Sequence, residues 1–234
     1  MSDLTFQEKE SGEFLDSAAL RPLRLLLVMN TSLQHIYDGF AKTYDAGRDQ
    51  FDMSAVLPPF FTSLDKKTGE ALDLGCGAGI PFPAYFIQHG WSVVGVDFSR
   101  EMLKLAAHLV PKMEGECGDM GTVRFDPDSF DAITAIYSLF HIPREQHAEL
   151  FIRFHEWLRP GGQMLFTYAT KAYTGQDSFE GTKEFMGQRL FYSHLTPEQM
   201  DAALVAAGFK IESAVLREIG GESFLWVTVQ KPSA

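Results

Sequence analysis

The stretch EALDLGCGAG at residues 70–79 decides the fold of this 234-residue chain. A short apolar run bounded by charge and glycine is typical of a buried parallel strand. Gly75, Gly77 and Gly79 follow it, and an apolar segment of helical character comes next. Glycine is needed there because the backbone must turn sharply and let a ligand approach closely. The stretch therefore predicts a strand, a tight turn and a helix N-terminus, with a ligand at the strand's carboxyl end in a doubly wound α/β sheet.

The spacing of the glycines separates the classes of nucleotide-binding turn. A dinucleotide-binding fingerprint requires a third glycine or alanine at position 80, which is Ile80 in this chain. No Lys-Ser/Thr pair follows the glycines, so the turn is not a P-loop. The sequence therefore argues against both of these phosphate-binding motifs.

The order Asp73, Gly75, Gly77 and Gly79 resembles motif I of the class I S-adenosylmethionine-dependent methyltransferases, Asp-x-Gly-x-Gly-x-Gly. The resemblance implies a Rossmann-like fold, methyltransferase activity, and S-adenosylmethionine as cofactor with S-adenosylhomocysteine as product. It also implies that these residues and the intervening Cys76 contact the cofactor. A structural turn in another α/β protein is the alternative for this motif taken alone.

An acidic residue closes the next predicted strand, which ends in Val96-Asp97-Phe98-Ser99. Asp97 lies about 20 residues after the first glycine, where such units place the carboxylate that reaches the ribose hydroxyls. The resemblance adds Phe98 to the cofactor site and places Met102 beside the adenine. The alternative for Asp97 is a helix cap.

A third motif is Gly118-Asp119-Met120, which follows a short predicted strand at about residues 114–118. It resembles the Gly-Asp motif of the same family. By that resemblance, Asp119 accepts a hydrogen bond from the adenine amino group and Met120 flanks the ring. An ordinary loop aspartate is the alternative.

The first 68 residues come before the glycine turn and are expected to form a helical cap, with helices at about 14–29, 31–46 and 53–64. Tyr44 and Arg48 are one helical turn apart, so a helix would present both on one face. In many methyltransferases of this class a Tyr and an Arg before motif I close over the cofactor, and the Arg pairs with the methionine carboxylate. The alternative is a solvated arginine, and residues 1–35 resemble nothing in the family.

Residues 69–234 are expected to form one Rossmann-like catalytic domain. Its seven-stranded sheet would have an antiparallel last strand, with strands at about 70–74, 91–96, 114–118, 130–137, 163–169, 209–216 and 224–230. Tyr137 closes the fourth strand and is assigned to the cofactor site. Residues 171–195 form a long connection rich in aromatic side chains, and we expect this segment to be a lid over the acceptor.

Three side chains are candidates for catalysis: His141 after the fourth strand, and Tyr192 and His194 in the expected lid. Methyl transfer to an activated sulfonium mainly requires alignment and exclusion of water. A base matters only if the acceptor must lose a proton. The alternative for His141 is a packed structural histidine.

Composition and absent motifs restrict the acceptor. A net charge of −11 argues against nucleic acid and anionic membranes as partners. Two cysteines make neither a disulfide framework nor a metal site, so a reducing, cytoplasmic compartment is expected. The apolar run at residues 23–29 is far shorter than the ~20 residues of a membrane span, and the polar N-terminus does not resemble a signal peptide.

The segment at residues 137–142 has no Asn/Asp-Pro-Pro-aromatic motif, no Pro-Cys nucleophile and no acidic residue for a catechol-type magnesium site. The sequence therefore predicts a metal-independent methyltransferase that acts on a small, apolar or aromatic molecule. A cofactor-binding protein without transferase activity and, less favoured, a nicotinamide-dependent oxidoreductase are the alternatives. The acceptor atom and the oligomeric state stay open.

Overall fold

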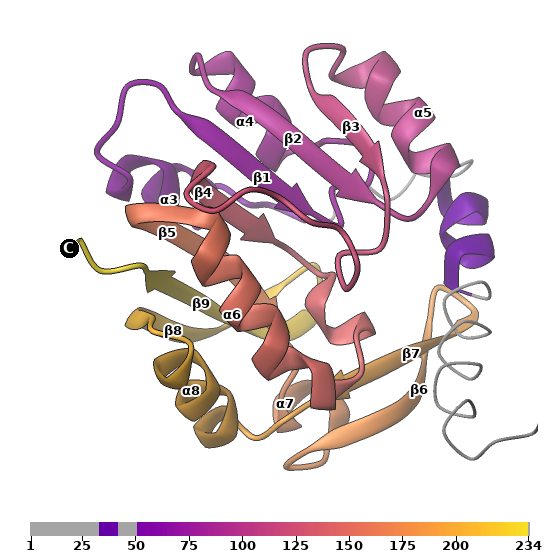
Figure 1. Cartoon of the computed structure of the whole chain (residues 1–234). Coiled ribbons are helices and arrows are strands. Elements are labelled where there is room, and N and C mark those ends of the chain that lie inside the picture. Colours follow the sequence, from indigo (N-terminus) through magenta and orange to yellow (C-terminus); the bar gives the residue numbers. More distant parts are fainter. Residues whose placement is uncertain (1–32, 42–50, 234) are drawn as a thin grey trace, which may run out of the picture.

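The computed structural model describes residues 33–41 and 51–233 (Figure 1). Its centre is a seven-stranded sheet with the order β3-β2-β1-β4-β5-β9-β8. The strands are β1 (Glu70–Leu74), β2 (Ser92–Asp97), β3 (Glu114–Cys117), β4 (Phe130–Ala135), β5 (Leu158–Tyr168), β8 (Lys210–Ile219) and β9 (Glu222–Gln230). The pairs among β1 to β5 are parallel, whereas β9 is antiparallel to both β5 and β8. The predicted fold class is therefore confirmed.

The order of the strands reverses at β1, which pairs with β2 on one side and β4 on the other. Every residue of β4 is buried, as expected for a central strand covered on both faces. In open sheets of this kind, ligands bind beyond the carboxyl ends of the strands at the reversal point. The glycine turn after Leu74 lies at this point of the sheet.

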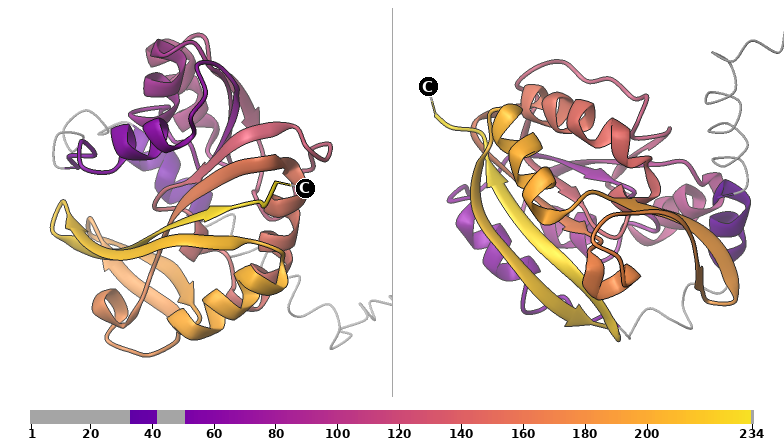
Figure 2. Two further views of the ribbon diagram at one scale, coloured as in Figure 1. Left: turned by 90° about the vertical axis from the view of Figure 1, so that its left-hand side faces the viewer. Right: turned by 90° about the horizontal axis from the view of Figure 1, so that it is seen from below.

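Helices cover both faces of the sheet (Figures 1 and 2). One layer consists of α3 (Leu57–Ser63), α4 (Phe82–Gln88) and α5 (Arg100–Leu109), and the other consists of α6 (His147–Trp157) and α8 (Pro197–Ala206). On the second face, Phe151 and Phe154 of α6 and Leu204 of α8 are fully buried. None of the described helices is long and apolar enough to cross a membrane.

The cap region is described only in part. Residues 33–40 form a helix within the range expected to be helical at 31–46, and α3 lies within the expected helix at 53–64. The helix expected at 14–29 lies outside the described residues, as do Tyr44 and Arg48.

The segment at residues 171–195 is more regular than the predicted long connection. It contains the short helix α7 (Lys171–Thr174) and a hairpin of β6 (Phe179–Phe185) and β7 (Gln188–His194), which form their own two-stranded sheet. Met186 and Gly187 both have positive φ in the two-residue turn, the geometry that matches the twist of a hairpin. The sequence does not signal it because β6 carries apolar side chains only at its two ends, Phe179 and Phe185, although its residues alternate between partly buried and exposed.

Several element boundaries differ from the sequence prediction. The fourth strand ends at Ala135 rather than Tyr137, and residues 144–157 form the 3₁₀ turn η4 (Arg144–Gln146) followed by α6. The fifth strand begins at Leu158 rather than Gln163, because Leu158 already pairs with Phe130 and the residues between form an irregularity in which Gly161 has a φ of +82°.

Candidate functional site

A cavity of about 230 Å³ lies at the carboxyl ends of the central strands, under the helix at residues 33–40, which we call the roof helix. It is lined by Leu33, Gln34 and Tyr37 of the roof helix, Gly75, Val96 to Phe98, Gly118 to Met120, and Tyr137, Ser138, His141 and Ile142. A larger groove of about 530 Å³ lies between α3 and the β8–β9 pair, and none of the predicted site residues lines it.

The glycine turn connects β1 to both of its neighbours. The N–H groups of Gly75 and Cys76 donate to the carbonyl oxygen of Val96 at 2.8 and 3.0 Å. A Cβ atom at Gly75 would lie 2.4 Å from the Cβ of Ser138, and φ is +76°. By contrast, a Cβ at Gly77 would meet no atom within 4 Å. Residue 75 must therefore be glycine for packing, whereas the backbone at Gly77 faces open space.

Asp97 is held rigidly at the rim of the cavity. Its Oδ2 accepts from the Gly77 N–H at 2.9 Å and its Oδ1 from the Ser99 N–H at 2.8 Å. Burial raises the pKa of this carboxyl group to about 6, although both hydrogen bonds act to lower it. The carboxylate is thus oriented by two backbone donors that leave further lone pairs for a ligand.

Asp73 is a second buried carboxyl group, and it does not line the cavity. The hydroxyl of Thr134 donates to its Oδ1 at 2.5 Å. Burial raises the pKa of Asp73 to about 7, and the charge of Asp97 adds to this effect. These two carboxyl groups put a concentrated negative potential beneath the glycine turn when both are ionised.

The other predicted cofactor residues divide into two groups. Phe98, Asp119 and Met120 line the cavity, and Oδ1 of Asp119 accepts from the Gly121 N–H at 2.7 Å. Outside the lining are Cys76, Gly77, Gly79 and Met102. Met102 is buried in the first turn of α5, where its N–H donates to the capping hydroxyl of Ser99.

The roof helix contributes two contacts that the sequence analysis missed. The hydroxyl of Tyr37 is 2.8 Å from Nε2 of His141, and Oδ1 of Asp38 accepts from the Ser99 hydroxyl at 2.6 Å. The available signal was the helical spacing of Leu33, Tyr37 and Phe40, which predicts that these side chains share one buried face.

His141 is buried with both ring nitrogens hydrogen-bonded. Its Nδ1 lies 2.6 Å from the carbonyl oxygen of Phe191, and its Nε2 lies 2.8 Å from the Tyr37 hydroxyl. Because a carbonyl can only accept, Nδ1 carries the proton and Nε2 accepts from Tyr37. Burial lowers the pKa of His141 to about 4, so the ring is neutral near pH 7.

The two catalytic candidates in the hairpin lie outside the cavity lining. His194 is fully buried: its Nδ1 donates to the Leu195 carbonyl, and its Nε2 accepts from the Thr174 hydroxyl at 2.7 Å. Tyr192 stacks on Phe140 with ring centroids 4.9 Å apart. In this structure both side chains hold the hairpin against the domain.

Tyr137 lines the cavity in an unusual backbone conformation with φ of +54°. The Thr167 hydroxyl oxygen accepts from its N–H at 2.6 Å, and its ring packs on Phe224 and Trp226. Its hydroxyl is buried without a hydrogen-bond partner in the described structure. A strained residue with an unpartnered polar atom is typical of a ligand-binding position.

Part of the sequence is similar to known proteins. Residues 71–162 match a family described as methyltransferase domain. A protein of Bacillus thuringiensis (strain Al Hakam), named an uncharacterized methyltransferase, is 27% identical over 172 residues, which span 70% of this chain and 79% of the relative.

Solved structures share the fold. An S-adenosylmethionine-dependent methyltransferase from Mesorhizobium loti has a TM-score of 0.60 and 23% identity over 74% of this chain and 96% of its own. The Burkholderia thailandensis 1,6-didemethyltoxoflavin-N1-methyltransferase, with that compound and S-adenosylhomocysteine bound, has a TM-score of 0.66 and 20% identity over 92% of both chains. The [4+2]-cyclase SpnF has a TM-score of 0.56 and 18% identity over 75% of this chain and 82% of its own.

The unpartnered hydroxyl of Tyr137 gives a stability prediction. Because Tyr137→Phe removes a buried group that makes no hydrogen bond, we expect the free energy of unfolding to stay constant or rise by up to about 1 kcal/mol. The matched control is Tyr168→Phe, whose hydroxyl bonds Nδ1 of His147 and the Leu195 N–H. The control should lose about 1–3 kcal/mol. Urea unfolding measures both, and equal losses would contradict the prediction.

Proposed function

The chain is a class I S-adenosylmethionine-dependent methyltransferase, and we propose that it transfers the methyl group to a small molecule without a metal ion. The observation that carries the proposal is the position of Asp97. Backbone N–H groups of Gly77 and Ser99 orient its carboxylate at the rim of a cavity, directly beside the glycine turn. Adenosine hydroxyl groups need such an acceptor.

We assign the ribose hydroxyls to Asp97 and the adenine to the end of the cavity formed by Phe98, Asp119 and Met120. The methionine part then extends over the glycine turn toward Tyr137. A carboxylate near the sulfonium and the ammonium group favours the cationic cofactor, and the buried Asp73 can supply this charge. Tyr44 and Arg48 stay proposed partners of the methionine carboxylate.

The chemistry of the donor supports the proposal of metal independence. The sulfonium already activates the methyl carbon, so an enzyme contributes mainly by aligning the donor with the acceptor and excluding water. Among the described residues, no group of three or more His, Cys, Asp or Glu side chains is arranged as a metal site. The acceptor can be N, O or S within this proposal.

The acceptor is proposed to be apolar or aromatic because the aromatic side chains of Tyr37 and Tyr137 line the cavity, and further aromatic rings pack behind Tyr137. Phe140 stacks on Phe224 with ring centroids 5.0 Å apart, and Tyr137 lies 5.2 Å from the same ring. The Burkholderia neighbour is named for methyl transfer to a heteroaromatic small molecule, which supports an acceptor of this kind.

We further propose that residues 1–68 act as a cap and residues 171–195 as a lid on the catalytic domain of residues 69–234. The roof helix lies on the cavity, as a cap requires. The hairpin is joined to the cavity wall through β7, where the Ser193 hydroxyl donates to the Ile142 carbonyl.

The experiment is a screen of small aromatic and heteroaromatic acceptors, read as S-adenosylhomocysteine production. Turnover of the cofactor with any acceptor supports methyl transfer. Calorimetric binding of S-adenosylmethionine without turnover over a broad panel would instead favour a cofactor-binding protein without transferase activity. Binding of a nicotinamide cofactor in its place would overturn the proposal.

Cofactor affinity should depend on pH through Asp97. Its raised pKa of about 6 means that the group takes up a proton as the pH falls toward 5, and the protonated form is a poorer acceptor for ribose hydroxyls. The affinity for S-adenosylmethionine should therefore fall by up to tenfold per pH unit below about 6. Asp97→Asn should bind about 10–100-fold more weakly at pH 7.5, and its affinity should vary less with pH.

The matched control is Asp126→Asn, which changes an exposed aspartate in a loop. This variant should retain both the affinity and the pH dependence of the parent. Calorimetric titration at a series of pH values measures the effect, and an unchanged affinity in folded Asp97→Asn would refute the assignment of Asp97.

The lid proposal predicts a difference in amide hydrogen exchange. β6 pairs only with β7, so its backbone amides should exchange faster than those of the buried β4 in the free protein. Acceptor binding should slow exchange in β6 and β7. Mass spectrometry of both states measures this, and protection of β6 equal to that of β4 before binding would contradict a mobile lid.

A further inference from the structure

We infer that Tyr37 takes the proton from the methyl acceptor, and that His141 is a positioning residue that holds the Tyr37 hydroxyl proton away from it. The inference rests on the proposed methyl transfer and extends it to a substrate class. That class consists of phenols, enols and heteroaromatic N–H compounds, whose nucleophilic atom carries a proton before transfer.

The hydrogen-bond chain through Tyr37 and His141 has a defined direction. It runs from the Tyr37 hydroxyl to Nε2 of His141 at 2.8 Å, and from Nδ1 of His141 to the Phe191 carbonyl at 2.6 Å. Since the carbonyl has no hydrogen to give, His141 donates from Nδ1 and must accept at Nε2. The Tyr37 hydrogen is therefore committed to His141.

The phenol oxygen of Tyr37 can still accept a hydrogen bond. With its hydrogen directed at His141, the phenol oxygen keeps lone pairs that can accept a hydrogen bond from a group in the cavity. Tyr37 and His141 both line this cavity. The Tyr37 ring is fixed by edge-to-face contacts with Phe98 and Phe40 at 5.6 and 5.5 Å, so the oxygen is held in place.

Other titratable groups of the lining are less suited to the task. Asp97 and Asp119 are assigned to the ribose hydroxyls and the adenine, and each already accepts a hydrogen bond from the backbone. Tyr137 has no described partner to which its own hydroxyl proton could pass. In the described lining, the Tyr37–His141 pair alone combines a proton acceptor with a second acceptor behind it.

The proton transfer balances as follows. A lone pair of the acceptor oxygen or nitrogen forms a bond to the methyl carbon, and the carbon–sulfur bond breaks with its electron pair going to sulfur. The acceptor's proton moves to the Tyr37 oxygen while the Tyr37 proton moves to Nε2 of His141. The sulfonium charge is lost as the imidazolium charge appears, so the net charge of the site is unchanged.

The surroundings of Tyr37 disfavour a phenolate, so the phenol must pass on its own proton as it takes one up. Burial raises the pKa of Tyr37, and the charges of Asp97 and Glu222 and the phenol of Tyr173 add to this effect. Burial lowers the pKa of His141, so the imidazolium returns its proton readily once the products leave.

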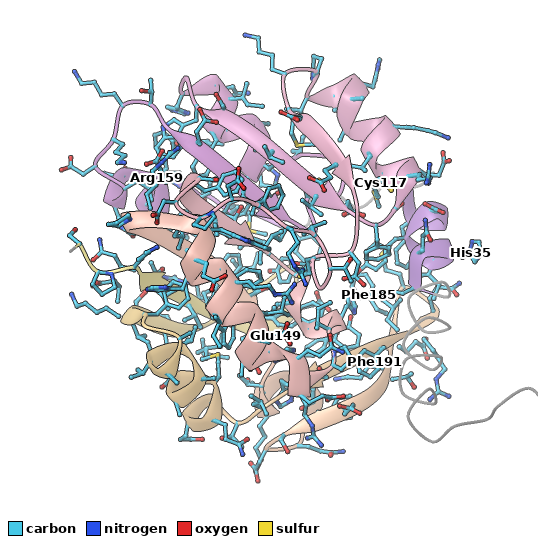
Figure 3. All side chains as sticks on the ribbon, viewed as in Figure 1. His35, Cys117, Glu149, Arg159, Phe185 and Phe191 are labelled. Atoms are coloured by element: carbon cyan, nitrogen blue, oxygen red, sulfur yellow. The ribbon has the colours of Figure 1, made fainter. Side chains whose placement is uncertain are left out.

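The hairpin takes part through its backbone. Phe191 lies on β7, and Phe185 at the end of β6 reaches toward the roof helix (Figure 3). The ring centroids of Phe185 and Phe40 are 6.1 Å apart. One hairpin thus contacts the roof helix that carries Tyr37 and supplies the carbonyl group that fixes the tautomer of His141.

The test uses the full chain, S-adenosylmethionine and a series of ring-substituted phenols and N–H heterocycles with different pKa values. We expect Tyr37→Phe to lower kcat by about 10²–10⁴-fold for acceptors of high pKa, with a cofactor Kd within about threefold of the parent. The loss should shrink as the acceptor pKa falls, because an acceptor that is already ionised needs no base. Tyr85→Phe on α4, outside the cavity lining, is the matched control.

His141 is tested by two variants. His141→Gln offers an amide oxygen to the Tyr37 hydroxyl and should retain more activity than His141→Leu, which offers none. Nitrogen-15 NMR of the free protein should show His141 protonated at Nδ1, with the Gln variant assigning its signals among the seven histidines.

Three results would overturn the inference. One is a kcat of Tyr37→Phe within threefold of the parent, or a loss that is the same at every acceptor pKa. Another is an Nε2-protonated His141 in the NMR spectrum. The third is turnover by the parent of tertiary amines alone. Absence of S-adenosylhomocysteine with every acceptor would instead refute the proposed methyl transfer itself, and this is seen before any variant is made.

Discussion

The site depends on the close approach of two loops at Gly75. Its N–H and that of Cys76 donate to the Val96 carbonyl, which joins the ends of β1 and β2. On the other side, the Ser138 hydroxyl donates to the Leu74 carbonyl at 2.7 Å, and a Cβ at Gly75 would lie 2.4 Å from that of Ser138. A side chain here would separate the loops that follow β1 and β4, and Asp97 would lose its alignment with the Gly77 N–H.

A second constraint joins the roof helix to this framework. Asp38 accepts from the Ser99 hydroxyl, which also caps α5, and Tyr37 donates to His141 after β4. Each such bond contributes only about 1 kcal/mol on its own, but the two end on different loops of the cavity. Because these loops are positioned by the sheet, the place of the roof helix depends on the paired central strands.

The glycine turn and its acidic partner could be predicted from sequence because both are set by local backbone geometry. Gly75, Gly77 and Gly79 all have positive φ, a conformation that few other residues tolerate, so their spacing is visible in the chain.

Tyr37 could not be found this way, since its partner is 104 residues distant and only the tertiary fold joins them. The sequence equally offers no means to see that both nitrogens of His141 are bonded, so it leaves a catalytic base and a packed structural histidine both open. The β6–β7 hairpin was missed for a related reason: aromatic residues of β7 pack on partners from η3 (Leu139–His141) and β9 rather than on their own neighbours.

The charges of the site suit a cofactor that loses its own charge in the reaction. Burial raises the pKa values of Asp73 and Asp97 to about 7 and 6, which means that keeping both carboxyl groups ionised is unfavourable without a nearby cation. A cationic sulfonium and ammonium offset this, and in the described part of the chain the cavity lining contains no lysine or arginine that would do so in their place. After methyl transfer the product carries a neutral thioether, so one of the two offsetting charges is gone once His141 has released the transferred proton. We therefore expect the same carboxyl groups to favour S-adenosylmethionine over S-adenosylhomocysteine, a difference that assists product release.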